Sequence, residues 1–357
     1  MLAVMTTPGR PGTVRVGSVQ SAAAAPGGVR VRTLEVGVCG TDREIADGEF
    51  GVAPPGESHL VLGHEFLGTV VEDGGGFSEG DLVTATVRRS CGRCPACAAG
   101  SPDACDTGEY TERGITALHG FASELVIEQP EHLVAVPKPL GRLGVLAEPG
   151  SICARGIRHA MTIGGRHEWT PKRTLVIGAG AIGMLATYQL RLLGLDVWTA
   201  SRGGRESEKG RLVAASGAEY VSTAETPLPD LRDEVGGFDL VVEASGDAEI
   251  MLGVLTLLRR NGVGCLLGLD SHRRPVSIDS TVVGVDAVIE NRVLFGSVNA
   301  HASDWRGAVN QLEAMRLRWP DALEAMIGLR VTPDRFDDAF AFRGVKATLV
   351  FAKFPSP

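Results

Sequence analysis

A glycine-rich loop at residues 178–183 constrains the fold of this chain more than any other feature. The loop reads Gly178-Ala179-Gly180-Ala181-Ile182-Gly183, follows the apolar segment 175–177 and opens a helix-like segment over 182–193. In this setting the first glycine permits a tight turn, the second lets the backbone approach a pyrophosphate, and the third lets the helix pack closely on the sheet. The helix then directs free N–H groups and a partial positive charge at phosphates. The loop therefore predicts a dinucleotide-binding fold.

The segments after the loop alternate between strand-like and helix-like patterns. Strand-like runs stand at 197–200, 218–221, 239–244 and 263–269, and further helix-like segments stand at 208–216 and 249–258. The pair Asn261-Gly262 predicts a turn before the last of these strands. Alternation of these lengths indicates a parallel sheet covered by helices on both faces. We therefore expect an α/β, doubly wound domain over residues 153–299.

The first 152 residues have a different sequence pattern. Strand-like segments at 29–36, 67–72, 81–87 and 121–127 are separated by Gly and Pro turns, which favours a β-barrel or sandwich-like domain. Helices are expected at 151–160 and 303–317, and a final strand at 347–351. We expect residues 300–357 to complete the first domain, so that the 357 residues form two domains.

The end of the strand after the glycine loop indicates which dinucleotide is bound. Proteins that bind NAD usually have Asp or Glu there, which accepts a hydrogen bond from the ribose 2′-hydroxyl. This chain has Ser201, Arg202 and Arg205, with no acid between Val197 and Arg205. Because a guanidinium pairs with a 2′-phosphate that a carboxylate would repel, we expect NADP(H) in preference to NAD(H). The alternative is that both arginines are ordinary solvated loop charges.

Four of the seven cysteines crowd into a single loop. Cys91, Cys94, Cys97 and Cys105 offer four thiolates within fifteen residues, and Gly92, Pro95 and Gly100 supply turns. Tetrahedral zinc needs four donors, and short spacings let one loop supply them all. We expect a closed structural zinc site; an iron–sulfur cluster or two disulfides are the alternatives.

Other donors are dispersed along the chain and carry no spacing signal. Cys39 stands in a Val-rich stretch, His64 and Glu65 follow Gly63, and Glu148 precedes Pro149. Taken singly, a buried cysteine is usually a small core residue. The histidine and the carboxylates have equally ordinary structural interpretations, so spacing alone does not assemble a site from them.

Charge and hydropathy exclude several classes of partner. The formal net charge of −8 repels phosphate backbones, which argues against nucleic-acid binding. No apolar run reaches the length of a membrane span, and residues 1–12 lack the apolar core of a signal peptide. These features predict a soluble cytoplasmic protein, with no membrane partner, that acts on a small molecule.

Taken together, these motifs resemble those of the medium-chain, zinc-dependent alcohol dehydrogenases, and most of all their glucose dehydrogenase branch. The resemblance covers nearly the whole chain in the family's order. The segments that carry it are 37–45 (GVCGTDREI), 60–65 (LVLGHE), 80–83 (GDLV), the four-cysteine loop, 107–110 (TGEY), 112–115 (ERGI), 146–149 (LAEP), the glycine loop and 297–299 (SVN).

The resemblance implies an architecture and a metal site. The first domain would be a GroES-like β-barrel, the second a Rossmann domain, and the active site would lie in the cleft between them. Cys39 and His64 would bind a catalytic zinc, with Glu65 or Glu148 as the third or exchanging ligand. The open fourth position would let zinc act as a Lewis acid on the substrate hydroxyl while hydride passes to the nicotinamide.

The resemblance also implies roles for other residues. Thr41 would relay the substrate proton, and Asp42 would orient the zinc-binding histidine. Glu112 would contact a sugar hydroxyl, Glu148 would border the substrate, and Asn299 would lie beside the nicotinamide and substrate. A homodimer or homotetramer is also implied.

The chain departs from the glucose-using pattern at three positions. Val87 stands where an amide is typical, Gly150 where Leu is typical, and Ile152 where some members have a polar residue. A pocket without hydroxyl partners discriminates less strongly among alcohols. The sequence therefore predicts an oxidoreductase for a sugar or polyol-like secondary alcohol, and leaves open a biosynthetic dehydrogenase for an aminocyclitol, modified sugar or less polar alcohol. A zinc-free reductase or a non-enzymatic NADPH-binding protein is disfavoured by the complete set of metal-ligand candidates.

Overall fold

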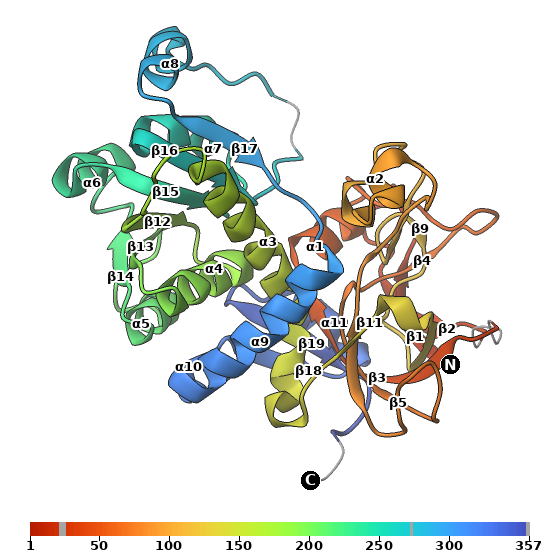
Figure 1. Cartoon of the computed structure of the whole chain (residues 1–357). Coiled ribbons are helices and arrows are strands. Elements are labelled where there is room, and N and C mark those ends of the chain that lie inside the picture. Colours follow the sequence, from red (N-terminus) through yellow and green to blue (C-terminus); the bar gives the residue numbers. More distant parts are fainter. Residues whose placement is uncertain (21–25, 272–273, 355–357) are drawn as a thin grey trace. The chain divides into compact units, whose positions relative to one another are not determined.

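The structure is a computed structural model that describes residues 1–20, 26–271 and 274–354 (Figure 1). Its contacts divide the chain into two compact units. The first unit comprises Met1–Ser151, Asn299–Glu313 and Ile327–Pro357, and the second comprises Ile152–Val298 and Ala314–Met326.

The first unit is built mainly from β-strands. Its largest sheet has the order β11-β6-β5-β3-β19-β18, with β10 also paired to β3, and two smaller sheets have the orders β2-β1-β4 and β7-β8-β9. The strands are β1 (Leu2–Thr6), β2 (Arg15–Ser18), β3 (Val29–Val38), β4 (Leu60–Val61), β5 (Glu65–Val70), β6 (Leu82–Ala85), β7 (Arg88–Arg89), β8 (Thr111–Arg113), β9 (Ala117–Leu118), β10 (Leu125–Glu128), β11 (Leu133–Ala135), β18 (Ile327–Val331) and β19 (Lys346–Val350). The helices are α1 (Gly40–Ala46), α2 (Pro95–Ala98), α11 (Phe336–Ala341) and the short 3₁₀ turns η1 (Pro102–Ala104), η2 (Pro130–His132), η3 (Lys138–Leu146) and η5 (Pro333–Arg335).

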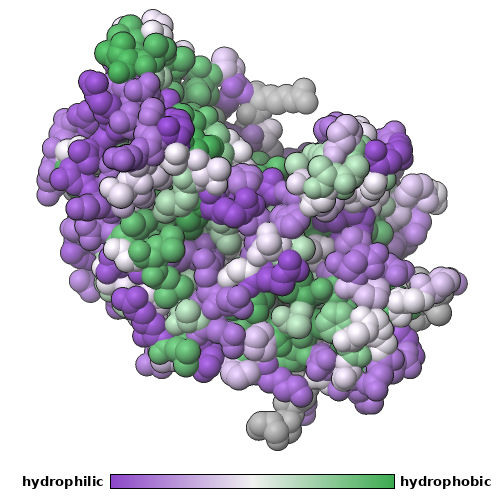
Figure 2. All heavy atoms as spheres, in the orientation of Figure 1, coloured by the Kyte–Doolittle hydropathy of each residue, from purple (hydrophilic) through white to green (hydrophobic). Residues whose placement is uncertain are grey.

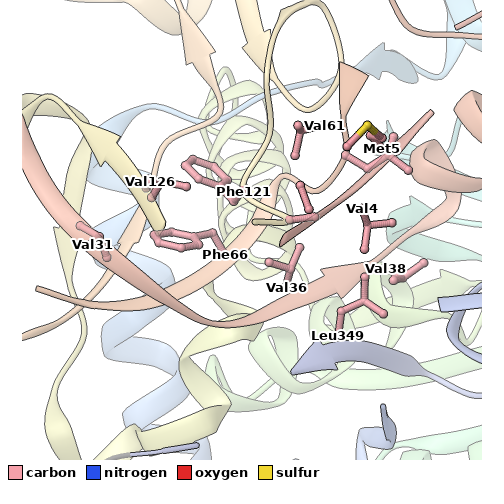
Figure 3. Close-up of a cluster of buried hydrophobic side chains, with 14 of the residues drawn as sticks. Val4, Met5, Val31, Val36, Val38, Val61, Phe66, Phe121, Val126 and Leu349 are labelled. Carbon is pink, nitrogen blue, oxygen red and sulfur yellow. The ribbon is translucent and has the colours of Figure 1, made fainter. Parts of the chain in front are cut away.

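The core of this unit follows from the alternation along its strands. Val29 and Val31 of β3 are buried while Arg30 and Arg32 between them are exposed, as a half-buried strand requires. Farther along, β3 lies between β5 and β19, and every residue from Thr33 to Val38 is buried. Figure 3 shows the cluster of buried hydrophobic side chains in this unit, in which the rings of Phe66 and Phe121 stack with centroids 4.4 Å apart.

The second unit contains a six-stranded parallel sheet of order β14-β13-β12-β15-β16-β17. This order, with the reversal between β12 and β15, confirms the expected doubly wound fold. None of the helices among the described residues is long and apolar enough to cross a membrane. The elements are α3 (Ala147–Gly164, which starts in the first unit), β12 (Arg173–Ile177), α4 (Ala181–Leu192), β13 (Asp196–Ser201), α5 (Glu208–Ala215), β14 (Glu219–Ser222), α6 (Leu228–Val235), β15 (Phe238–Glu243), α7 (Ala248–Leu257), β16 (Leu258–Leu266), the π-helical turn η4 (Val282–Asp286), α8 (Ala287–Ile289), β17 (Val293–Gly296), α9 (Ala302–Arg318, which also starts in the first unit) and α10 (Pro320–Ala325).

Three local expectations differ from the structure. The helix expected at 151–160 begins at Ala147, because Pro149 lies in its first turn, where a missing N–H is tolerated. The strand expected at 121–127 begins at Leu125, since the Phe121 N–H donates to the Gly63 carbonyl instead. The turn expected at Asn261-Gly262 lies inside β16, where Asn261 adopts a φ of 64° at a shift in register against β15.

The C-terminal segment also divides differently from the expected boundary at residue 300. Residues 314–326 belong to the second unit, whereas the rest of 299–357 belongs to the first. The reason is visible in the packing of the turn before α10. The Trp319 ring meets the buried Tyr188 ring of α4 edge-on, with centroids 5.1 Å apart.

A buried ion cluster links three strands of the first unit. The Glu128 carboxylate on β10 lies 2.5 Å from Arg89 and 3.0 Å from Arg113, and it is 3% exposed. Burial alone raises the pKa of Glu128, but the two positive charges outweigh that effect and the net pKa is lowered. The cluster therefore stabilises the fold above the unfolded-state pKa, and this contribution is lost as the pH falls through the lower folded-state value.

We expect Glu128→Gln to destabilise the protein by about 3 kcal/mol at neutral pH, because it leaves two buried guanidinium groups without their carboxylate. The difference from the unmodified protein should shrink as the pH falls below about 4. Denaturant unfolding across this pH range measures both effects. Glu72→Gln is the matched control, since Glu72 pairs with Arg30 at 3.5 Å on the surface and should change stability by less than about 0.5 kcal/mol. Equal effects of the two substitutions would contradict the account.

Candidate active site and metal centres

Strand pairing in the first unit brings the dispersed donors together. The register of β3 against β5 sets Gly37 opposite Glu65, so Cys39 just after β3 meets His64 just before β5. The register of β3 against β19 sets Val38 opposite Ala347, which brings Lys346 to the same place. A Cβ on Gly37 would lie 1.9 Å from a Glu65 carboxylate oxygen, so only glycine fits there.

Cys39 and His64 form the centre of this group. The Cys39 Sγ atom lies 3.0 Å from His64 Nε2. Asp42, in the first turn of α1, accepts a hydrogen bond from the Cys39 N–H at 3.0 Å, which anchors the cysteine at the start of that helix. The other Asp42 oxygen lies 3.6 Å from His64 Nδ1. Asp42 therefore anchors Cys39 through its backbone N–H and faces the Nδ1 atom of His64. The Nε2 atom of the same ring then points at the Cys39 thiol.

Two buried carboxylates complete the group and differ in their surroundings. Both Glu65 oxygens lie 2.6 Å from the Lys346 ammonium, and these two side chains are each 2% exposed. The Glu148 carboxylate is only 7% exposed and lies close enough to His64 and Glu65 for their charges to act on its pKa. Sequence analysis did not identify Lys346, because a single lysine at the start of a strand carries no spacing signal.

Burial and neighbouring charges shift the ionisation of this group. Burial raises the pKa of Cys39. Burial acts to lower the pKa of His64, but the negative charges of Cys39 and Asp42 outweigh it and the net pKa lies well above the ordinary value. Burial raises the pKa of Glu148 to about 7. One thiol, one imidazole and one of the two carboxylates would match the donor set of a zinc site with three protein ligands.

The four cysteines of the loop at 91–105 form a second, separate cluster. The thiols of Cys91, Cys94, Cys97 and Cys105 all lie within 4.8 Å of one another. Each remains a free thiol. A hydrogen bond from Thr107 is the largest cause that lowers the pKa of Cys91 to about 6, and Thr107 likewise lowers the pKa of Cys105. Four converging sulfur atoms fit a closed tetrahedral metal site.

The glycine loop lies at the carboxyl end of β12 in the second unit. Gly178 has a φ of 100°, and a Cβ there would lie 2.8 Å from the Ala244 carbonyl oxygen. A Cβ on Gly183 would lie 1.9 Å from the Gly178 carbonyl oxygen, so the helix could not pack as closely. A Cβ on Gly180 would meet none of the described atoms within 4 Å, which leaves that face of the backbone open. The loop thus has the geometry that close approach of a pyrophosphate requires.

Arg202 and Arg205 lie on the exposed loop after β13, and Ser201 is the last residue of that strand. The loop is tethered from β14, since the Tyr220 hydroxyl donates to the Gly203 carbonyl at 2.7 Å. Arg205 lies 3.6 Å from Glu219 across the surface. The structure therefore presents both guanidinium groups to solvent beside the end of β13.

The residues implied to bind substrate have defined partners of their own. Glu112 on β8 accepts from Arg88 at 3.0 Å, and the Arg88 guanidinium also stacks on the Tyr110 ring, 3.9 Å from its centroid. Asn299 adopts a φ of 66° and donates to the Asp103 carbonyl at 3.4 Å. Thr41 lies in the first turn of α1, two residues after Cys39. Arg88 was missed by sequence analysis, because its neighbours across the strands are set by pairing and not by proximity in the chain.

A third group of potential ligands has a different explanation. Glu57, His59 and His119 lie together, with the His119 Nε2 atom 3.0 Å from Glu57. The Val61 N–H donates to His119 Nδ1 at 3.1 Å. Neutral His119 must therefore carry its proton on Nε2, where it donates to Glu57 and has no lone pair for a metal. We interpret this group as a hydrogen-bonded surface cluster.

Two family models match this chain. The model described as alcohol dehydrogenase GroES-like domain matches residues 25–138, and the model described as glucose dehydrogenase C-terminus matches residues 141–349. These matches confirm the expected fold class.

Individual relatives agree with the family models. The glucose 1-dehydrogenase of Methanocella arvoryzae is 43% identical over 335 residues, which cover 93% of each chain. The structure of Haloferax mediterranei glucose dehydrogenase in complex with NADP, Zn and gluconolactone superposes with a TM-score of 0.91 at 31% identity, covering 99% of this chain and 100% of that one. Galactitol-1-phosphate dehydrogenase from Escherichia coli shares the fold, with a TM-score of 0.80 at 24% identity, covering 98% of this chain and 100% of that one.

Proposed function

This chain belongs to the glucose dehydrogenase family of zinc-dependent alcohol dehydrogenases, and we propose that it transfers a hydride from C1 of glucose or a closely related sugar to NADP⁺. The observation that carries the proposal is the convergence of Cys39, His64 and Glu65 at the ends of paired strands, with the buried Glu148 of α3 close enough to interact with His64. The relative from Haloferax mediterranei, whose structure holds NADP, Zn and gluconolactone, supports the same cofactors here.

Cys39, His64 and Glu148 would hold the catalytic zinc. Glu65 is the less favourable third ligand, because Lys346 already engages both of its oxygens. The Glu148 carboxylate is buried beside His64 and Glu65, and a buried carboxylate is costly unless a hydrogen bond or a bound cation stabilises it. When bound, the zinc would supply a Lewis acid that polarises the substrate oxygen.

The remaining side chains of this site would position groups and move the proton. Asp42 faces the Nδ1 atom of His64 and so keeps Nε2 oriented for the metal. The Thr41 hydroxyl would relay the proton that leaves the sugar hydroxyl, accepting it while it passes its own proton on towards solvent. Glu112 would accept a hydrogen bond from a second sugar hydroxyl, with Arg88 holding its carboxylate in place. Asn299 would contact the nicotinamide.

NADP(H) would bind to the glycine loop, with its 2′-phosphate between Ser201, Arg202 and Arg205. We expect Arg202→Ala to raise the KM for NADP⁺ about tenfold, because one charge-assisted contact to phosphate is lost, and to leave the KM for NAD⁺ nearly unchanged. Steady-state kinetics with both cofactors measures the effect. Arg211→Ala, on the exposed face of α5, is the control and should change neither KM. A variant that keeps full NADP⁺ affinity would show that these arginines are solvated loop charges.

The four cysteines at 91–105 would hold a structural zinc. Four sulfur donors leave no open position for substrate, so this metal would fix the loop. Its thiols must stay reduced to bind zinc, which supports our placing of the protein in the cytoplasm.

We propose a homodimer formed through the second unit. β17 is an edge strand of its sheet, and Figure 2 shows apolar surface over the neighbouring α8. The side chains of Val283, Val285, Val288 and Ile289 are between 46% and 69% exposed. An open edge beside apolar side chains favours pairing with a second copy of the chain.

Light scattering tests this assembly. We expect a dimer for the unmodified protein and a monomer for the double variant Val288→Asp, Ile289→Asp, because charged side chains cannot be buried unpaired in an interface. Leu193→Asp, at an exposed site elsewhere on the second unit, should leave the assembly intact. A double variant of unchanged mass would place the interface elsewhere.

A second candidate is a biosynthetic dehydrogenase for a modified sugar, aminocyclitol or less polar alcohol. The observation that favours it is Val87, a buried apolar residue directly before the Arg88 that pairs with Glu112.

A substrate panel separates the candidates. Purified protein is mixed with NADP⁺ or NAD⁺ and with aldoses, amino sugars, cyclitols and simple secondary alcohols, and the absorbance of the reduced nicotinamide is followed. We expect fast reduction of NADP⁺ with glucose or a related aldose. Activity confined to cyclitols, amino sugars or simple alcohols would support the second candidate.

A further inference from the structure

The four-cysteine loop forms hydrogen bonds to residues outside the loop, which a metal site that stabilised only the loop would not require. The Asp103 carbonyl, two residues before Cys105, accepts a hydrogen bond from Arg88 at 3.1 Å and a longer one from the Asn299 amide at 3.4 Å. Arg88 in turn holds the Glu112 carboxylate. A single peptide group of the loop therefore contacts the residue that supports the sugar contact and the residue assigned to the nicotinamide.

A second bond joins the same loop to the segment that carries Asn299. His301 Nε2 lies 3.1 Å from the Gly100 carbonyl oxygen. The His301 Nδ1 atom accepts from the Ser303 N–H at 3.1 Å, so the proton must lie on Nε2, where it donates to Gly100. The imidazole thus has two separable duties: Nδ1 caps the start of α9, and Nε2 ties residues 299–301 to the loop.

The backbone at Asn299 needs such support. Its φ of 66° lies in the left-handed region, which asparagine tolerates better than most residues but which is still sparsely populated. A residue held in that conformation depends on its surroundings to keep its side chain in place. The bond from its own side chain to Asp103 and the bond from His301 to Gly100 supply such restraint.

We propose that His301 is a positioning residue, which locks the four-cysteine loop to the segment carrying Asn299 so that this loop sets the nicotinamide contact and the Arg88–Glu112 sugar contact together. The proposal rests on the function proposed above for its kinetic consequence. The loop's cysteines would then stabilise the binding of both substrates, and not only the local fold.

Two substitutions separate the duties of the imidazole. In His301→Asn the side-chain oxygen can still accept from Ser303 and cap α9, but the side chain is too short to reach Gly100. In His301→Gln the amide nitrogen takes the place of Nε2 and restores the donor to Gly100. Arg93→Ala changes an exposed residue in the same loop, which pairs with the exposed Glu109, and serves as the control.

We expect His301→Asn to raise the KM for both NADP⁺ and glucose about fivefold, the effect of one lost hydrogen bond, with kcat changed less. Amide hydrogen exchange, measured by mass spectrometry on the zinc-loaded protein, should become about fivefold faster in peptides from 91–105 and 297–301 together. His301→Gln and Arg93→Ala should behave like the unmodified protein in both measurements.

The exchange measurement does not depend on the identity of the substrate. Unchanged exchange and unchanged KM values in His301→Asn would overturn the proposal, and so would equal impairment of the Asn and Gln variants. If no sugar is oxidised by any form of the protein, the proposed function fails while the exchange comparison still decides whether the loop and the Asn299 segment are coupled.

Discussion

Substituting Cys39 by serine should lower kcat/KM for NADP⁺-dependent sugar oxidation about 10³-fold, because the Lewis acid contributes several kcal/mol to transition-state stabilisation. The hydroxyl of serine is a poor replacement for a thiolate, and His64 and Glu148 alone would not retain zinc at the same affinity. Metal analysis should show that the zinc content falls from two ions per chain to one. The fold should persist, because Cys39 lies between β3 and α1 and Asp42 still accepts a hydrogen bond from its N–H.

Cys153→Ser provides the matched control for this result. Cys153 lies in α3, and its thiol donates to the Ile182 carbonyl at 3.2 Å, a bond that a serine hydroxyl can also form. Activity and zinc content should therefore stay near those of the unmodified protein. A Cys39→Ser protein that kept both zinc ions and full activity would show that the catalytic metal does not depend on this residue.

Substituting Cys94 by serine should remove the structural zinc and lower the melting temperature by roughly 4 °C, equivalent to a loss of about 3 kcal/mol for a chain of this length. Cys94 is 4% exposed and its sulfur lies 4.0 Å from that of Cys105, so the substitution removes a buried donor from the centre of the cluster. Scanning calorimetry and metal analysis measure the two effects. Zinc content should again fall to one ion per chain, but here the ion that remains is the catalytic one.

Ala98→Ser is the control for the loop, since it adds a hydroxyl at an exposed position and leaves the four thiols unchanged. Its melting temperature and zinc content should match the unmodified protein. A Cys94→Ser protein with unaltered zinc content and melting temperature would indicate that the four cysteines hold no metal.

The parts of this fold that were predicted from sequence have local signals. The glycine loop, the alternation of strands and helices over 175–258, and the four-cysteine loop each depend on spacing within a few residues. The elements placed wrongly lack such a signal or carry a misleading one. Asn261-Gly262 has the composition of a turn, but the pairing of β15 with β16 accommodates it as an irregularity inside the strand.

The candidate active site shows the same contrast between residues with a local sequence signal and residues without one. Cys39, His64, Glu65 and Glu148 could be grouped only by resemblance, because strand pairing and not spacing brings them together. Lys346 and Arg88 were not predicted at all. Each is the partner of a carboxylate that sequence analysis did identify, and each reaches it from a distant segment or a paired strand. Partners of this kind become visible only once the register of the sheet is known.

Isotope transfer tests whether this chain moves a hydride from C1 of a sugar to NADP⁺. Protein with both zinc sites filled is incubated with NADP⁺ and glucose that carries deuterium at C1, and the reduced cofactor is isolated for mass spectrometry. The account predicts NADPH that contains the deuterium, together with the lactone of the sugar. Reduced cofactor without deuterium, or no reduction of NADP⁺ with any aldose, would contradict it.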